Sequence, residues 1–173
     1  QALDGINIDI IGFDLCYGAM LEIYYEIQDK ADYFIGSEET EPEDGWEYNI
    51  LFENILERGT TAPIIRKAVI DSYSEKYSET TGATISSIST SSISDINAAL
   101  NSFSSALYTS CDSSQIQTEL QNILFSDTED FYATPGDLNI DLLHAAALIR
   151  DKTDYADTEA DNLISAIENA VEY

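Results

Sequence analysis

The sequence predicts an α/β domain in which helices cover a mainly parallel sheet. Two short runs rich in β-branched and aromatic residues, 6–13 and 33–37, have the composition of buried strands, the first of them covered on both faces. Residues 84–90 form a third run of this kind. Between and after these runs, apolar residues recur three or four positions apart, as in amphipathic helices. Strands that alternate with helices indicate a layered α/β fold.

The first strand is predicted to bring Asp14 and Cys16 to its carboxyl end. Because side chains alternate along a strand, the two point the same way if extended geometry continues that far. Gly18 and Ala19 then let the next element approach closely, and a helix is expected to run to about Lys30.

The second strand opens into a segment that we call the acidic loop, residues 38–47. The loop holds six Asp or Glu residues in ten positions, together with a Pro and an Asp-Gly turn signal. Sites in open α/β sheets form where strands end at their carboxyl edges. We therefore expect the functional site where the acidic loop and Cys16 meet.

Most of the remaining chain is predicted to be helical. The expected helices cover 48–58, 63 to about 77, 93 to about 107, 115–125, 142–152 and 157–171. Gly59 is placed to end the first of them and Pro63 to begin the next. Ser92 and Asp95 form a variant of the capping box, and residues 127–137 are polar and turn-rich. Strands are few for so many helices, so we expect a processed or trimmed chain with further strands upstream.

The composition is strongly acidic, with 7 Lys and Arg residues against 33 Asp and Glu and a formal net charge of −26. Such a field argues against nucleic acids and anionic membranes and favours cationic partners or substrates. Solubility in a salty or extracellular setting explains it equally well. No apolar run approaches the roughly 18 residues of a membrane span.

Cys16 is the first candidate for chemistry. A thiol between a strand end and a helix start is exposed to the helix dipole and to backbone N–H groups, which favour the thiolate and stabilise an oxyanion. The alternative is a small buried apolar residue, which is also how we interpret Cys111. The single histidine, His144, lies in an apolar helix and is interpreted as structural. A base for Cys16 is therefore expected outside this chain.

Asp14 and the acidic loop are the second candidate. Asp14 together with Asp44 is predicted to line a pocket for a Lys or Arg side chain, which two carboxylates hold through charge-assisted hydrogen bonds. A solvated acidic turn and a calcium site are the alternatives, although the loop lacks the EF-hand pattern. No other metal or nucleotide motif is found.

These residues resemble the clostripain family of cysteine peptidases. Family members carry a D-x-C strand end with a Glu six residues after the Cys, matched here by Asp14, Cys16 and Glu22. A family phrase close to ADYLVASEETEPGDGW corresponds to ADYFIGSEETEPEDGW at 31–46. The later pieces TISSIST, SSISDINAAL and GDLNIDLLHAAALI fit more loosely. The sequence departs from the family at Tyr17 and Gly18, where Leu-Met is common, and at Glu43, where Gly is usual.

The resemblance implies a caspase-like three-layer sandwich, here incomplete, as a single peptidase domain portion over 1–173. Residues 1–46 then form the nucleophile strand, helix and specificity loop, and 47–173 the remaining helices and strand. It further implies an endopeptidase that cleaves after Arg or Lys through a Cys–His dyad, with Cys16 as nucleophile and Asp14 and Asp44 as substrate-binding acids.

The same resemblance implies partners and location. The catalytic histidine belongs to an upstream segment, and family precursors are often cut into two chains that stay together. The partners are then peptide or protein substrates with Arg or Lys and the histidine-bearing chain. No cofactor is needed for the chemistry, calcium is allowed, and the setting is secreted or attached to the envelope of a bacterium. A non-catalytic surface module and a calcium-binding structural domain around 38–47 are the alternatives.

Overall fold

The structure is a computed structural model that describes residues 3, 5–131 and 139–173. The chain forms two compact units, Gln1–Ile93 with Ala170–Tyr173 and Ser94–Asn169. We call them the sheet unit and the helical unit. Of the turn-rich segment predicted over 127–137, residues 132–137 lie outside the described residues.

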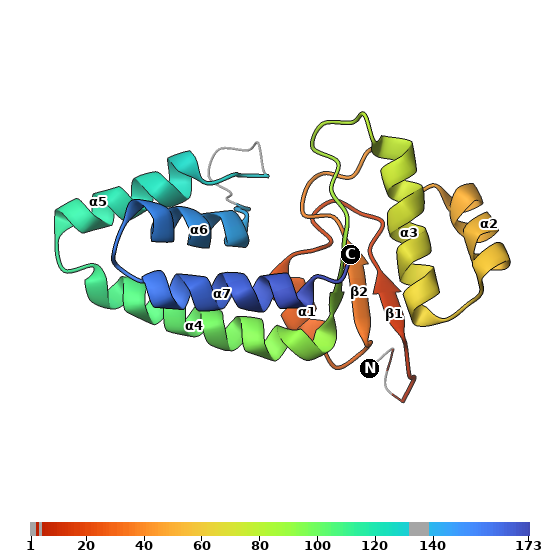
Figure 1. Ribbon diagram of the computed structural model, residues 1–173, viewed down its shortest axis with the longest axis horizontal. Helices are drawn as coiled ribbons and strands as arrows, with labels where there is room; N and C mark the ends of the chain where they lie inside the picture. Colours follow the sequence, from red (N-terminus) through yellow and green to blue (C-terminus); the bar gives the residue numbers. More distant parts are fainter. Residues whose placement is uncertain (1–2, 4, 132–138) are drawn as a thin grey trace. The chain divides into compact units, whose positions relative to one another are not determined.

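The sheet unit is built on three strands in the order β1–β2–β3 (Figure 1). They are β1 (Ile10–Gly12), β2 (Tyr33–Gly36) and β3 (Ser86–Ser89). β1 lies parallel to β2, as predicted, but β3 runs antiparallel to it. The sheet is thus mixed. The Thr84 hydroxyl bonds the chain just after β2, so β3 starts at the carboxyl end of β2 and runs back along it.

β1 is shorter and less covered than predicted. It spans three residues, and in the described part of the chain it has one neighbouring strand. Ile10 and Ile11 are therefore half-buried, and Ile6 is 55% exposed. Ile10 packs against the cluster that contains Ile35 and Ile11 against the one that contains Phe34, so the expectation of a strand covered on both faces is confirmed in part.

Helices lie on both faces of the sheet, in line with the predicted three layers. Because side chains alternate, Phe34 and Ile35 of β2 belong to opposite clusters. Phe34 packs in a cluster that includes Tyr24 of α1 (Leu21–Ile27). Ile35 packs with residues of α2 (Tyr48–Arg58) and α3 (Ala62–Tyr77). The predicted bounds of α2 are confirmed, as are Gly59 as its C-cap and Pro63 in the first turn of α3.

A buried arginine holds the last residues of the chain in the sheet unit. Residues 171–173 pair with β3 in antiparallel fashion, through Ile88 opposite Val171 and two backbone hydrogen bonds at Ser87. Arg66 is 2% exposed, donates to Glu172 at 2.7 Å and lies 3.6 Å from the centre of the Tyr33 ring. The sequence analysis did not identify this cluster.

The helical unit follows the predicted helices closely. It comprises α4 (Ile93–Ser110), α5 (Ser114–Asn122), the π-turn η2 (Ile123–Asp127), α6 (Leu142–Lys152) and α7 (Asp157–Ala170). Buried alanines, among them Ala145, Ala146 and Ala160, occupy its core. The predicted cap at Ser92 is wrong. Ser92 lies within the 3₁₀ turn η1 (Thr90–Ser92), which runs straight into α4.

Candidate active site

Cys16 lies in a tight turn beyond the end of β1, and its side chain is exposed. Tyr17 has a φ of 57°, a left-handed conformation that is uncommon for a residue other than glycine. The Tyr17 N–H donates to the Glu39 carbonyl at 3.1 Å, and the Ala19 N–H donates to the Ser37 carbonyl at 2.9 Å. The turn is therefore held against the residues that follow β2. Because the thiol is exposed, the alternative interpretation of Cys16 as a small buried apolar residue is wrong.

The environment of the thiol differs from the predicted one. α1 begins at Leu21, five positions beyond Cys16, and the effect of a helix dipole is confined to its first turn. The expected exposure of the thiol to a helix start is therefore wrong, and the condition of extended geometry up to Cys16 is not met, because β1 ends at Gly12. Among the described residues, the Cys16 N–H donates to no acceptor. That N–H is available to an oxyanion.

Two glycines allow the turn to lie against β2. A Cβ added at Gly36 would come within 2.8 Å of the Gly18 backbone, and one at Gly18 within 2.6 Å of the Phe13 Cβ. A larger side chain at Gly36 would push the Cys16 turn away from β2, and one at Gly18 would collide with Phe13. The expected role of Gly18 in close approach is confirmed, although its neighbour is a strand and not the next helix.

Asp14 is an exposed residue whose carboxylate contacts the end of the acidic loop. One oxygen accepts from the Trp46 N–H at 3.2 Å, and the other accepts from the Tyr48 hydroxyl at 2.8 Å. The hydrogen bond that Tyr48 donates to Asp14 raises the pKa of Tyr48, and burial adds to this. A Cβ at Gly45 would lie 2.8 Å from the same carboxylate. Asp14 therefore joins the segment after β1 to the end of the acidic loop and the start of α2.

The acidic loop is anchored at both ends. At its start, Ser37 shares a hydrogen bond of 2.9 Å with Thr84. At its end, the Tyr77 hydroxyl donates to the Gly45 carbonyl at 2.7 Å, and Lys76 lies 3.4 Å from Glu47. A freely solvated turn is therefore wrong for most of the loop. Exposed residues remain within it, among them Glu43 and Asp44 in the turn closed by the Gly45 N–H and the Pro42 carbonyl.

Glu41 is a further acidic residue near Asp14, and sequence reasoning missed it. Trp46 Nε1 donates to its carboxylate at 3.2 Å. Burial raises the pKa of Glu41 and the charge of Asp14 adds to this, while Trp46 and the nearby Tyr73 hydroxyl lower it. Neither its second oxygen nor the Tyr73 hydroxyl reaches hydrogen-bond geometry with a described partner. The local sequence carries no signal for this cluster, because Tyr73 comes from α3.

The other predicted side chains occupy structural positions. His144 Nδ1 accepts from the Glu129 N–H at 3.1 Å, and the backbone N–H of His144 donates to the Asp141 carboxylate at 2.9 Å. Cys111 is a free thiol, half-buried where we expected burial. Within the described ranges, no three His, Cys, Asp or Glu side chains form a group that could hold a metal ion. Calcium binding stays a prediction.

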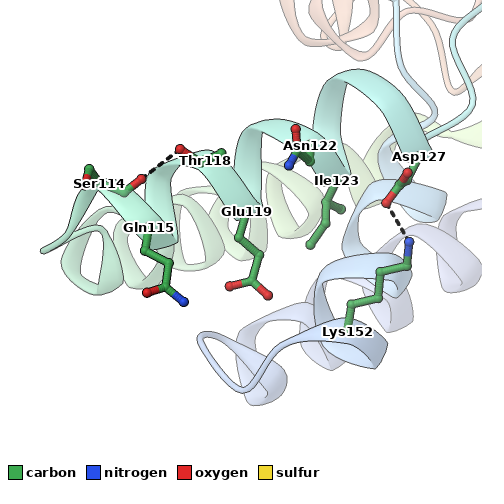
Figure 2. A pocket seen from close by; sticks show the side chains of 8 residues that line it. All are labelled: Ser114, Gln115, Thr118, Glu119, Asn122, Ile123, Asp127 and Lys152. Carbon is green, nitrogen blue, oxygen red and sulfur yellow. Dashed lines mark hydrogen bonds and ion pairs between the residues drawn. The ribbon is translucent and has the colours of Figure 1, made fainter.

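A groove of about 610 Å³ lies in the helical unit (Figure 2). Its lining residues are Ser114, Gln115, Thr118, Glu119, Asn122, Ile123, Asp127 and Lys152. Lys152 pairs with Asp127 at 2.6 Å, and the Thr118 hydroxyl donates to the Ser114 carbonyl at 2.8 Å. The lining contains neither cysteine nor histidine, so the groove holds no cysteine nucleophile and no histidine base.

None of the described helices combines the length and apolar character that crossing a membrane requires. A search of curated proteins found no match to the sequence. The family model of the clostripain family, Peptidase_C11, matches residues 1–173.

Solved structures of C11 proteases share the fold. An inactive zymogen from Parabacteroides distasonis superposes with a TM-score of 0.72 at 20% identity, covering 99% of this chain and 45% of that one. A clostripain from Bacteroides thetaiotaomicron, in complex with the peptide inhibitor BTN-VLTK-AOMK, gives 0.67 at 18%, covering 98% and 68%. A secreted C11 cysteine protease of that organism, with an irreversible peptide inhibitor, gives 0.63 at 23%, covering 95% and 44%. The chain thus spans less than half of two of these proteins.

Proposed function

The chain belongs to the clostripain family, and on that premise we propose that it carries the nucleophile of a cysteine endopeptidase that cleaves after Arg or Lys. One observation carries the proposal. Cys16 is exposed and lies two residues after Asp14. The Asp14 carboxylate in turn contacts Trp46 at the end of the acidic loop and Tyr48 at the start of α2. A nucleophile and an acid for a cationic side chain are thereby next to each other in the chain.

In the proposed reaction, a histidine from outside this chain accepts the Cys16 thiol proton. The sulfur attacks the carbonyl carbon after the basic residue, and the Cys16 N–H donates to the oxyanion that forms. The carbon–nitrogen bond then breaks, and the histidine returns the proton to the leaving amine. Water hydrolyses the resulting thioester and releases the new carboxyl end.

Asp14 is the proposed acid for the substrate's Arg or Lys. Its carboxylate is exposed and accepts two hydrogen bonds, which fix its orientation and leave lone pairs for a guanidinium or ammonium group. Asp44 is the proposed second acid, in an exposed turn of the acidic loop. The net charge of −26 draws basic peptides toward this edge. The peptide inhibitor of the Bacteroides clostripain, BTN-VLTK-AOMK, has Lys as the last residue of its peptide part, which supports this assignment.

We also propose that the chain is made as part of a precursor and works with a histidine-bearing partner chain. The inactive zymogen among the similar structures supports processing, and the secreted relative supports a location outside the bacterial cell or on its envelope. The chemistry requires no cofactor. Calcium binding at 38–47 is a separate proposal, which calcium-dependent melting that persists in Cys16→Ala would support.

The test uses the full-length gene product and matched fluorogenic peptides that end in Arg, Lys or a neutral residue. We expect cleavage after the basic residues and its complete loss in Cys16→Ala with the fold intact. Cleavage that survives Cys16→Ala would refute the nucleophile. A well-folded protein that cleaves none of the peptides would instead be a non-catalytic surface module of the family.

A further inference from the structure

α2 carries a stripe of exposed apolar side chains. Tyr48, Phe52 and Leu56 are 46%, 57% and 86% exposed. A spacing of four residues places them on one side of the helix, and the Tyr48 and Phe52 rings stack with centroids 6.1 Å apart. The side of α2 that packs in the core is formed by Leu51 and Ile55 instead. We call Tyr48, Phe52 and Leu56 the α2 stripe.

The α2 stripe is continuous with the candidate active site. Its first member, Tyr48, donates through its hydroxyl to the Asp14 carboxylate, and its ring lies 6.4 Å from that of Trp46. A molecule that places a cationic side chain at Asp14 therefore meets Tyr48 next. Figure 1 shows α2 as the outer helix of this side of the sheet unit, with α3 between it and the sheet.

Acidic residues border the α2 stripe. Glu53 and Glu57 follow Phe52 and Leu56 in sequence and are exposed. Each helical residue turns by about 100°, so these two carboxylates lie on the flank of the stripe that faces away from the buried Leu51 and Ile55. The surface thus combines an apolar row with a parallel negative row. Its complement is a polypeptide with apolar side chains and additional Lys or Arg.

We propose that the α2 stripe is a docking surface for the substrate polypeptide, used by residues adjacent to the basic residue that is cleaved. This inference rests on the proposed function, because the Asp14 site defines where the stripe begins. From Tyr48 to Leu56 the helix rises by about 12 Å, which matches roughly four residues of extended chain. Substrates with apolar and basic residues within about four positions of the cleaved bond are therefore preferred.

The experiment compares short and long substrates of the full-length enzyme. The short substrate is a single blocked Arg with a fluorescent leaving group. Each long substrate adds a segment of apolar and basic residues, either before or after the cleaved Arg. A polar counterpart of each long substrate carries Ser and Asp in that segment instead. The variant is Phe52→Gln/Leu56→Gln, and the matched control is Tyr108→Gln, because Tyr108 of the helical unit is 85% exposed.

For one of the apolar long substrates, we expect kcat/KM to be about tenfold higher than for its polar counterpart and for the short substrate. Burying one large apolar side chain has an effect of this size. In Phe52→Gln/Leu56→Gln this ratio should fall to near one, whereas Tyr108→Gln should keep it. Circular dichroism and melting of each variant establish that the fold is retained.

Different failures can be told apart. Cleavage after basic residues with no preference between apolar and polar long substrates would overturn the docking surface and leave the proposed function standing. The docking surface would also be overturned if Phe52→Gln/Leu56→Gln kept the ratio of kcat/KM between apolar and polar long substrates. It would likewise be overturned if the double variant only converted a dimer, seen by sedimentation, into a monomer, because the stripe would then bind a second copy of the chain. An enzyme that cleaves none of the substrates would overturn the proposed function, and the docking surface with it.

Discussion

The two units of this chain use their polar side chains in different ways. In the sheet unit, the polar contacts join segments far apart in sequence, such as Asp14 with Tyr48, Ser37 with Thr84 and Arg66 with Glu172. In the helical unit, many hydroxyls bond a carbonyl four residues back, as Ser102, Ser105 and Thr109 do. Tyr155 is an exception, since its hydroxyl donates to Glu119, which raises the pKa of Tyr155 to about 12.

The contrast shows where positional precision is needed. A hydroxyl that bonds its own helix satisfies itself locally and orients nothing else. A buried or half-buried group with a distant partner orients two segments, and losing the partner leaves an unsatisfied group. The sheet unit uses such contacts at the Cys16 turn and the acidic loop. We therefore expect substitutions in the sheet unit to alter the site, and those in the helical unit to leave it unchanged.

The largest expected effect comes from Trp46, whose ring is 9% exposed and lies against Gly12 of β1. Trp46→Ala should lower the free energy of unfolding of the sheet unit by about 3–5 kcal/mol, since a large ring is removed from a packed core. Hydrogen exchange, measured separately for peptides of each unit, determines this loss of stability. Amides of the helical unit should keep their protection from exchange. An equal loss of protection in both units would contradict the expectation that the substitution affects the sheet unit alone.

Asp14→Asn is expected to have the next largest effect. It removes the charge beside the cationic side chain of the substrate, so kcat/KM for Arg and Lys peptides should fall by about 100-fold, and that for neutral peptides much less. Asp44→Asn, on the acidic loop, is the matched variant. Asp14 is held in place by two hydrogen bonds, whereas Asp44 lies in an exposed turn, so a smaller loss of about a few fold is expected for Asp44→Asn. An equal loss for neutral and basic peptides would make Asp14 a structural residue.

His144→Ala tests the same comparison from the helical unit. The imidazole accepts one hydrogen bond from the Glu129 N–H, so its removal should lower stability by about 1 kcal/mol. Peptidase activity should change by less than about twofold, because the base is expected outside this chain. Steady-state kinetics checks this expectation, and a loss of activity well beyond the loss of folded protein would place the base on His144.

Glu41→Gln should give the smallest effect, visible in the pH dependence of stability. Burial raises the folded-state pKa of Glu41 above its ordinary value. The folded protein therefore holds this proton more tightly than the unfolded chain, so stability is greatest below the ordinary pKa and declines as the pH rises through the raised one. Gln is neutral throughout. Thermal melts from about pH 4 to pH 7 should thus show Glu41→Gln gaining on the parent protein as pH rises. A parallel shift at all pH values would mean that Glu41 is uncharged or solvated.

Sequence patterns alone determined the elements whose signals are local. The bounds of α2 and α6 follow from apolar spacing and end residues, such as Gly59 after α2, because a helix is built from contacts three or four residues apart. The D-x-C strand end and the phrase at 31–46 likewise indicated the family that the match over residues 1–173 shows.

Tertiary contacts decided the rest. The left-handed Tyr17, the direction of β3, the contact of Asp14 with Tyr48 and the proximity of Glu41 to Tyr73 depend on partners from other elements. No window of neighbouring residues contains both sides of such a contact. A hydrogen bond that closes tens of residues of chain forms only when the packed core has already brought its two groups together, so the core, and not the local pattern, set the geometry of the site.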